Sequence, residues 1–190
     1  EKGDAMRLFI AIELEDAIRE YIHQKQRALQ SCRIRGNFTR KENLHLTLRF
    51  LGEMGPDQIM PIEKALKDTA AAAAPFSMEM EEWGQFPSSR GKILWIGIGK
   101  GREPLKALVS ELETNLEKQG FEREKKVFQP HITVGREVQL EEDPERITTK
   151  AKIEPKEIHV SRISLMESKR INGVLTYIPI YRAELGQKEE

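Results

Sequence analysis

The sequence predicts an α+β protein of two pseudo-symmetric lobes, each an antiparallel sheet with outer helices, which enclose a central cleft. A length of 190 residues suits one domain, or two small lobes that share a core. Each half contains a helix followed, after a polar loop, by a strand that carries histidine, an aliphatic residue and threonine, at residues 45–47 and 131–133. This repeated pattern predicts a duplicated lobe. We expect residues 6–186 to form a single bilobal domain, with residues 1–5 as an expression remnant or a disordered tail.

The first three elements follow from side-chain periodicity. Alternation of apolar side chains predicts a strand over residues 7–12. A helix is expected over Asp16–Ser31, with Asp16 as its N-cap and an apolar stripe along one side. The next strand covers residues 44–51, where apolar and polar side chains alternate.

The middle of the chain predicts a second helix and a pair of strands. This helix begins near Pro56 and ends in a run of alanines that Pro75 stops. Strands are expected over residues 76–82 and 93–98. Turn-forming residues predict a loop over residues 84–91 between them.

The last third of the chain predicts one helix and three strands. The helix runs over residues 104–120, with proline in its first turn and glycine at its end. A short strand at residues 131–134 follows, and two longer strands cover residues 158–166 and 175–185. Pro179 within the last run indicates an edge strand or a bulge.

Composition excludes several classes of protein. Lysine plus arginine number 31, as do aspartate plus glutamate, so the zero net charge argues against a protein that holds nucleic acid by bulk charge. Hydrophobic residues make up 38% of the chain and lie in periodic runs, which indicates a globular protein. The single cysteine excludes a disulfide framework. No apolar stretch is long enough to span a bilayer and no signal peptide is visible, so we expect a cytoplasmic protein without membrane contact.

The two His-x-Thr patterns carry the chemical argument. Because side chains alternate along a strand, a histidine and a threonine two residues apart share one face. Two imidazoles across a cleft can serve as general acid and general base near neutral pH, and two hydroxyls can donate to a phosphate between them. The chain shows no nucleophile with a neighbouring base motif and no glycine-rich phosphate loop. Hydrolysis of a phosphodiester by an activated water, without metal, cofactor or covalent intermediate, fits these residues best.

The segments around both patterns resemble a known family. Residues 43–53, NLHLTLRFLGE, and residues 128–136, FQPHITVGR, are similar to the paired signatures of the 2H phosphoesterases. The closest branch is that of the RNA 2′,3′-cyclic phosphodiesterases, also called 2′-5′ RNA ligases. The likeness extends along nearly the whole chain from Met6, through residues 7–12, 86–87, 93–97 and 166–168, Gly173 and Tyr177.

This resemblance implies the opening of a 2′,3′-cyclic phosphate to leave a 2′-phosphate, without ATP or metal. RNA ends or small cyclic nucleotides would be the substrates, and reversible 2′-5′ ligation stays open. His45 would be the acid that protonates the departing 3′-oxygen, and His131 the base that activates water. Thr47 and Thr133 would hold the phosphate. Arg136 would neutralise the charge that develops on its oxygens.

The position of Arg136 departs from simple strand geometry. Strict alternation places it on the face opposite His131, so either Gly135 carries a bulge or the strand ends before Arg136. Arg49 has the parity to share a face with His45. It is therefore a rival phosphate contact.

Three other features have two interpretations each. Phe9 and Tyr177 could stack on a base, or they could pack on the second face of the sheet. The basic stretch of residues 33–41 is either a solvated loop or a weak guide for an RNA backbone.

Other functions stay open as well. Zinc sites recruit a third or fourth ligand, which neither pattern supplies at close strand spacing, so we expect no metal. An enzyme for another cyclic phosphate, such as ADP-ribose 1″,2″-cyclic phosphate, is the first alternative. An RNA-end-binding module without turnover is the second. We expect a monomer.

Overall fold

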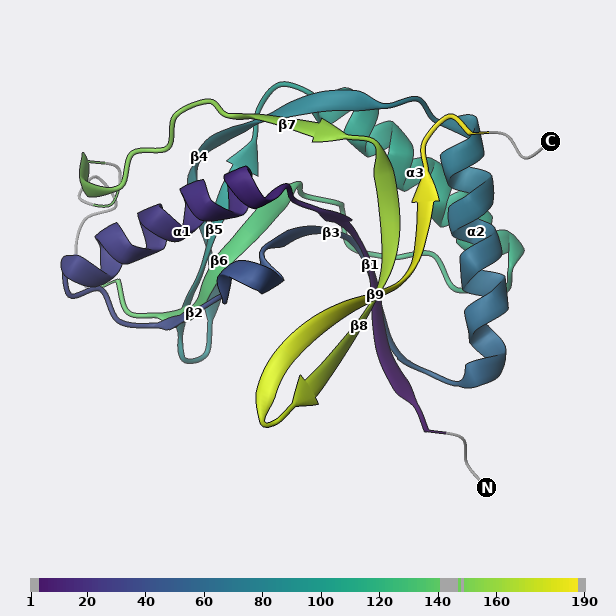
Figure 1. The fold of residues 1–190 in the computed structure, drawn as a ribbon, viewed down its shortest axis with the longest axis horizontal. Helices are drawn as coiled ribbons and strands as arrows, with labels where there is room; N and C mark the ends of the chain where they lie inside the picture. The colour runs from purple at the N-terminus through teal and green to yellow at the C-terminus, as the bar shows by residue number, and fades with distance from the viewer. Residues whose placement is uncertain (1–3, 141–146, 148, 188–190) are drawn as a thin grey trace.

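A computed structural model describes residues 4–140, 147 and 149–187, and an antiparallel β-sheet forms its centre (Figure 1). The strand order is β7-β4-β5-β6-β3-β1-β8-β9, with β2 paired to β6. All of the strand pairs are antiparallel, which confirms the predicted α+β class. The strands are β1 (Met6–Glu13), β2 (Asn37–Phe38), β3 (His45–Met54), β4 (Phe76–Ser88), β5 (Gly91–Ile98), β6 (His131–Val138), β7 (Glu157–Val160), β8 (Arg162–Ile171) and β9 (Val174–Glu184).

The two halves of the sheet meet at one residue pair. Leu46 of β3 lies opposite Ile132 of β6, and we call this pair the seam. Strands β3, β1, β8 and β9 lie on one side of the seam, and β6, β5, β4 and β7 lie on the other. The sequence suggests two lobes with separate sheets. In the structure these lobes are the halves of one continuous sheet, and each half begins with a His-x-Thr strand.

The α-helices that cover the sheet in the described part of the chain include α1 (Asp16–Ser31), α2 (Ile59–Ala72) and α3 (Arg102–Lys118). Figure 1 shows α1 beside β5 and β6, and α2 with α3 at the other end of the molecule. Gln26 of α1 donates from Nε2 to the carbonyls of Thr39 and Val134, at 2.9 Å each, which fixes α1 to the edge of β6. Asn115 of α3 donates to Thr69 of α2 at 2.9 Å. Two short 3-10 helices, Lys41–Asn43 and Pro56–Gln58, precede β3 and α2.

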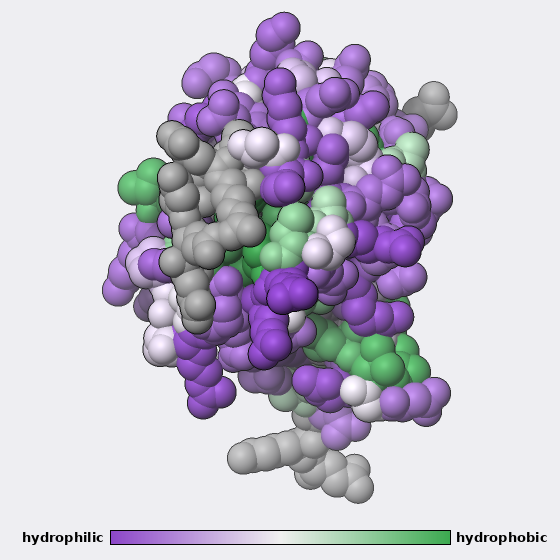
Figure 2. Space-filling view, turned by 90° about the vertical axis from the view of Figure 1, so that its left-hand side faces the viewer, coloured by the Kyte–Doolittle hydropathy of each residue, from purple (hydrophilic) through white to green (hydrophobic). Residues whose placement is uncertain are grey.

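A large hydrophobic cluster lies under both halves of the sheet, and two smaller clusters of buried residues are separate from it. The seam residues Leu46 and Ile132 are both 0% exposed and belong to a cluster that includes Ile22, Leu66 and Leu112 of the three helices. The face shown in Figure 2 is mostly hydrophilic, with apolar patches near its centre and at its lower right. No helix in the described part of the chain combines the length and the apolar character that crossing a membrane requires.

The structure differs from the local predictions at the start of α1 and at residues 84–91. Glu15, not Asp16, occupies the N-cap of α1, and it makes no side-chain capping bond. The predicted loop over residues 84–91 is mostly strand, because β4 runs to Ser88 and β5 starts at Gly91. Pro87 fits there because β7 pairs with β4 only over Phe76–Glu79, so its missing N–H faces a free edge.

The C-terminal part of the chain crosses from one half of the sheet to the other between β7 and β8. The predicted strand at residues 158–166 is two strands, because β7 pairs with β4 whereas β8 pairs with β1 and β9. The chain therefore breaks at Ser161 as it crosses between the halves. The prediction for Pro179 is confirmed, since it lies on the edge strand β9 opposite a register shift at Met166.

Candidate active site

The seam places the four motif side chains on one face of the sheet. Because Leu46 and Ile132 point into the core, the residues that flank them point to the opposite face. His45 and Thr47 of β3, and His131 and Thr133 of β6, are each half-buried there. The antiparallel register sets His45 beside Thr133 and Thr47 beside His131. The structure therefore brings together the four predicted residues.

Both imidazoles are oriented by the main chain in the same way. Nδ1 of His45 lies 2.7 Å from the carbonyl oxygen of Asn43, and Nδ1 of His131 lies 2.6 Å from that of Gln129. A carbonyl oxygen can only accept, so Nδ1 carries the hydrogen in both rings. Nε2 is then the atom of each ring that is free to exchange a proton. Nε2 of His45 already has a partner, the hydroxyl of Thr47 at 2.8 Å.

Two aromatic side chains flank each histidine. Phe9 and Tyr177 lie 4.9 Å and 5.2 Å from the ring of His45, measured between ring centroids. Phe9 is only 4% exposed, so it packs beneath His45 and has little ring surface left for stacking on a base. Tyr177 is half-buried and keeps part of its surface open.

Phe86 and Trp95 give His131 the matching environment. Their ring centroids lie 5.1 Å and 5.8 Å from that of His131. Neither residue is among the site residues predicted from the sequence. The signal lies in the pairing of β5 with β6, where Trp95 is opposite Thr133, and this register cannot be obtained from local periodicity.

Burial governs the charge state of both histidines. Burial lowers the pKa of His45 below its usual value. The hydrogen bond to the Asn43 carbonyl raises the pKa, whereas the electrostatic effects of Arg136 and His131 lower it further. Burial also lowers the pKa of His131, and Arg136 adds to the effect. Both rings are therefore neutral at pH 7 in the free protein. A phosphate anion bound between them would favour protonation.

A β-bulge returns Arg136 to the face of the motif residues. Trp95 pairs with Thr133, but the next residue of β5, Leu94, pairs with Gly135, so β6 contains an extra residue. Of the two predicted explanations, the bulge is therefore confirmed. The side chain of Arg136 is exposed, and its charge acts on both histidines.

Arg49 is occupied by other partners. Its Nη1 donates to both carboxylate oxygens of Glu113, at 2.8 Å and 2.7 Å, and its Nη2 donates to the carbonyl of Glu122 at 2.7 Å. Both side chains are close to fully buried. The carboxylate compensates the charge of Arg49, so the geometry favours a structural tie between β3 and α3 over a phosphate contact.

The basic stretch of residues 33–41 is held by nearby groups at its C-terminal end. Lys41 pairs with Glu20 at 2.5 Å and with Asp16 at 3.7 Å. Arg40 donates to the carbonyl of Leu175 at 3.1 Å. These contacts support the interpretation as a structural loop.

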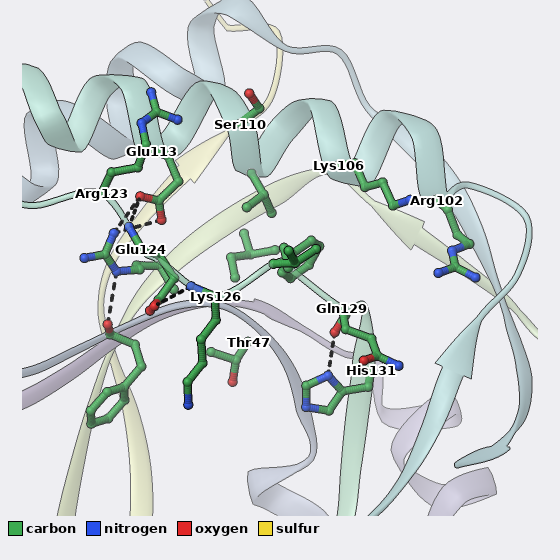
Figure 3. Close-up of a pocket in the computed structure, with 16 residues that line it drawn as sticks. Thr47, Arg102, Lys106, Ser110, Glu113, Arg123, Glu124, Lys126, Gln129 and His131 are labelled. Atoms are coloured by element: carbon green, nitrogen blue, oxygen red, sulfur yellow. Dashed lines mark hydrogen bonds and ion pairs between the residues drawn. The ribbon is translucent and has the colours of Figure 1, made fainter. Parts of the chain in front are cut away.

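A pocket opens on each side of the seam. The larger one has a volume of about 720 Å³ and reaches from Thr47 and His131 to α3 (Figure 3). The smaller one, of about 240 Å³, is lined by His45 and Tyr177. Among the residues that the structure describes, no group of three or more histidine, cysteine, aspartate or glutamate side chains is arranged to hold a metal ion.

The comparisons with known proteins agree with this geometry. The sequence model of the 2'-5' RNA ligase superfamily matches residues 14–172. A protein named RNA 2',3'-cyclic phosphodiesterase from Methanothermobacter thermautotrophicus is 33% identical over 132 residues, 69% of this chain and 71% of that one. A protein of the same name from Escherichia coli K12 is 30% identical over 187 residues, 97% of this chain and 99% of that one.

A solved structure extends the comparison to three dimensions. The crystal structure of E. coli LigT complexed with 3'-AMP matches with a TM-score of 0.74 and 28% identity, over 97% of this chain and 100% of that chain. The fold, the two motif segments and the sequence match agree. The chain therefore belongs to the 2'-5' RNA ligase superfamily of 2H phosphoesterases.

Proposed function

We propose that this protein is an RNA 2′,3′-cyclic phosphodiesterase that leaves a 2′-phosphate by two-histidine acid–base catalysis. The observation that carries the proposal is the matched pair of imidazoles at the seam. Each donates Nδ1–H to a main-chain carbonyl, which leaves Nε2 to exchange a proton, and Nε2 of His45 lies 2.8 Å from the hydroxyl of Thr47. Relatives named RNA 2',3'-cyclic phosphodiesterase and a relative solved with 3'-AMP support the choice of substrate.

The reaction would proceed by a single displacement at phosphorus. Nε2 of His131 accepts a proton from water, and the water oxygen forms the new bond to phosphorus. The bond from phosphorus to O3′ breaks, and Nε2–H of His45 gives its proton to O3′. Thr47, Thr133 and Arg136 stabilise the charge on the phosphate oxygens. An RNA 5′-hydroxyl in place of water would give 2′-5′ ligation by the same route.

The acid role requires a protonated His45, although burial lowers its pKa in the free protein. The bound cyclic phosphate carries a negative charge close to the ring. This charge favours the protonated form, so substrate binding and proton uptake would occur together. His131 has to be neutral to act as the base, and the lowered pKa that burial gives it in the free protein favours this form.

The test is hydrolysis of a short RNA with a 2′,3′-cyclic end in the presence of a chelator. We expect a 2′-phosphate product from the wild type. His45→Ala and His131→Ala should each lower kcat by roughly 10²–10⁴-fold, since each removes one proton-transfer group. The matched control is His159→Ala, because His159 is exposed on β7 and should leave kcat unchanged.

Other results would change the proposal. Near-normal turnover by His131→Ala would contradict the two-histidine mechanism, and a 3′-phosphate product would contradict the acid assignment. Turnover of ADP-ribose 1″,2″-cyclic phosphate without turnover of RNA would assign a small-nucleotide enzyme. Binding of the RNA without turnover would assign an end-binding module.

We also propose that residues 6–186 act as one bilobal domain, and that the protein is a monomer in the cytoplasm without metal or cofactor. Activity that survives exhaustive chelation supports the absence of a metal. Activity that is lost and then restored by zinc would contradict it. Sedimentation of the active protein measures its oligomeric state.

A further inference from the structure

The two histidines line different pockets. His45 lines the smaller one, of about 240 Å³, and His131 lines the larger one, of about 720 Å³. In an in-line displacement the attacking oxygen and the departing O3′ lie on opposite sides of phosphorus. His45 protonates O3′ in the proposed reaction, and His131 accepts the proton of the nucleophile. The larger pocket is therefore on the side from which the nucleophile arrives.

The side of the nucleophile contains far more space than hydrolysis needs. One water molecule occupies about 30 Å³ in the liquid, and the larger pocket exceeds this volume roughly twentyfold. Its size lies within the range of roughly 300–1,000 Å³ that holds ligands of many heavy atoms. The pocket extends from Thr47 and His131 to α3 and to the segment of residues 123–129 (Figure 3). A nucleophilic oxygen that belongs to a nucleotide therefore fits there.

Some of the cations that line this pocket have no ion pair within the part of the chain that the structure describes. We call them the free cations: Arg102, Lys106 and Lys126. Arg102 and Lys106 are one turn apart on α3. Figure 3 shows Lys126 on one side of Thr47 and His131, and Lys106 with Arg102 on the other. Unpaired positive charge therefore lies on both sides of the point at which the nucleophile would react.

The other charged residues of the pocket already have partners. Arg49 pairs with the carboxylate of Glu113, and Arg123 pairs with Glu117 at 3.6 Å. The carboxylate of Glu124 accepts two main-chain N–H groups, at 3.0 Å and 3.2 Å. The free cations outnumber this one carboxylate, so the lining is positively charged although the formal net charge of the chain is zero.

Apolar side chains complete the lining. Phe128 is half-buried, Phe50 is 48% exposed and Val127 is 94% exposed. Leu48 and Val109 are buried and also line the pocket. Cations combined with aromatic surface are typical of sites for single-stranded nucleic acid, in which phosphates meet the charges and bases stack on the rings. The lining therefore provides contacts for both parts of a nucleotide.

We propose that the larger pocket binds a second RNA strand, whose free 5′-hydroxyl takes the place of water as the nucleophile. This inference rests on the proposed function and assigns the acceptor subsite of a 2′-5′ ligation. The 5′-oxygen forms the bond to phosphorus, and its proton passes to Nε2 of His131. The bond from phosphorus to O3′ breaks, and Nε2–H of His45 gives its proton to O3′. The cyclic phosphate opens as the 2′-5′ linkage forms, so the step needs no other reactant.

The test measures how one donor is divided between nucleophiles. The donor is a dinucleotide with a 2′,3′-cyclic end and a 5′-phosphate, so it cannot serve as its own acceptor. Either a trinucleotide with a free 5′-hydroxyl or methanol competes with water for this donor. In the wild type, the ratio of the initial rates of ligation and hydrolysis should saturate as the trinucleotide concentration rises, because the acceptor binds to a site. Transfer to methanol needs no pocket and should rise linearly with the methanol concentration.

The test variant combines Arg102→Gln, Lys106→Gln and Lys126→Gln. At a trinucleotide concentration below saturation, its ratio of ligation to hydrolysis should fall about fivefold, which corresponds to one exposed ionic contact at the upper end of its range. The ratio of methanol transfer to hydrolysis should equal that of the wild type, because the catalytic groups are intact. Salt should act in the same direction on the wild type. The logarithm of the ligation ratio should fall with the logarithm of salt concentration, with a slope of about −0.7 for each phosphate contact.

The matched control is Lys118→Gln. Lys118 is also exposed on α3, but it lies outside the pocket, so both ratios should equal those of the wild type. Hydrolysis without ligation, or ligation that does not saturate, would overturn the inference and leave the proposed function standing. The same holds for a ligation ratio in the combined variant that is unchanged, or that falls together with the methanol ratio. If the wild type does not hydrolyse the donor, the proposed function itself fails.

Discussion

At the scale of single residues, each of the two histidines is flanked by two aromatic side chains, which come from different strands in the two cases. His45 lies between Phe9 and Tyr177, and His131 lies beside Phe86 and Trp95. The aromatic rings come from β1 and β9 on one side and from β4 and β5 on the other. These rings exclude water from the imidazoles, which is the main cause of the lowered pKa of both.

The first prediction concerns the dependence of activity on pH. The profile of kcat/KM reports the ionisation of the free enzyme, in which the pKa values of both histidines lie below 6.5. We expect the profile of kcat/KM against pH to be bell-shaped, with its maximum below pH 6.5. The profile of kcat should lie at higher pH, because the bound phosphate anion raises both pKa values in the complex. Steady-state kinetics from pH 4.5 to 9 measure both, and a kcat/KM maximum above pH 7 would contradict the expectation.

The second prediction concerns Arg136, whose charge lowers the pKa of both histidines. Arg136→Gln should move both limbs of the kcat/KM profile to higher pH. It should also lower kcat about a hundredfold, as the loss of one group that stabilises phosphate charge does. Arg90→Gln is the control, since Arg90 is exposed in the turn between β4 and β5. A lower kcat without a shift in either limb would mean that Arg136 does not act on the imidazoles.

At the scale of the elements, the β4–β5 hairpin positions one wall of the site. Gly84 of β4 lies opposite Trp95 of β5, and the indole ring covers it. A Cβ at position 84 would lie 2.2 Å from the ring atom Cη2 of Trp95. Glycine is therefore required for the indole to lie flat on β4. In this position the indole also packs beside the ring of His131.

The third prediction is that Gly84→Ala moves Trp95 and disturbs His131. The overpacked contact should lower the free energy of unfolding by about 1–3 kcal/mol. kcat should fall in the same variant, because the ring beside His131 is displaced. Urea denaturation and steady-state kinetics measure the two effects. Gln85→Ala, at the exposed neighbouring position, should change neither, and normal stability with normal kcat in Gly84→Ala would show that the contact is not needed.

At the scale of the whole molecule, the largest hydrophobic cluster extends under two half-sheets, whose strands β3 and β6 share one pair of backbone partners among the described residues. Leu46 and Ile132 belong to a cluster that contains residues from α1, α2 and α3. The two halves should therefore unfold together, although few hydrogen bonds join their strands. The side chains at the seam also pack beneath the strands that carry His45 and His131.

The fourth prediction tests whether the two halves of the sheet unfold together. Ile132→Ala should lower the free energy of unfolding by about 2–5 kcal/mol, and Ile132→Val by about 0.5–1.5 kcal/mol. Denaturation of the wild type and of both variants, followed by fluorescence and by circular dichroism, should give one coincident transition in each case. Two separate transitions would show that the halves are independent domains.

The sequence predicts the parts of this structure that depend on local periodicity. Alternating side chains are sufficient to assign β3 and the first half of β6, and they place histidine and threonine on one face. The alternation of side chains and the presence of Gly135 predict either a bulge before Arg136 or the end of the strand, and the structure contains the bulge. The partner of Arg49 could not be predicted, because Glu113 lies 64 residues away on α3.

The remaining differences also depend on contacts between distant segments. Turn-forming residues over 84–91 predict a loop, but pairing with β5 keeps them extended. For the same reason Phe86 and Trp95 were not identified as neighbours of His131. Their approach depends on the register of β4, β5 and β6, and register is set by the completed sheet rather than by a local pattern.

The carbonyl groups that hold His45 and His131 have one more consequence. They belong to the main chain at positions 43 and 129, where any amino acid supplies the same oxygen. Replacing the side chain of Asn43 by alanine removes its hydrogen bonds to Leu175 and Tyr177 but not the carbonyl, so an alanine scan does not isolate the groups that orient the two rings. Only a change of the backbone, such as an ester in place of the amide that contains the carbonyl, weakens the acceptor itself.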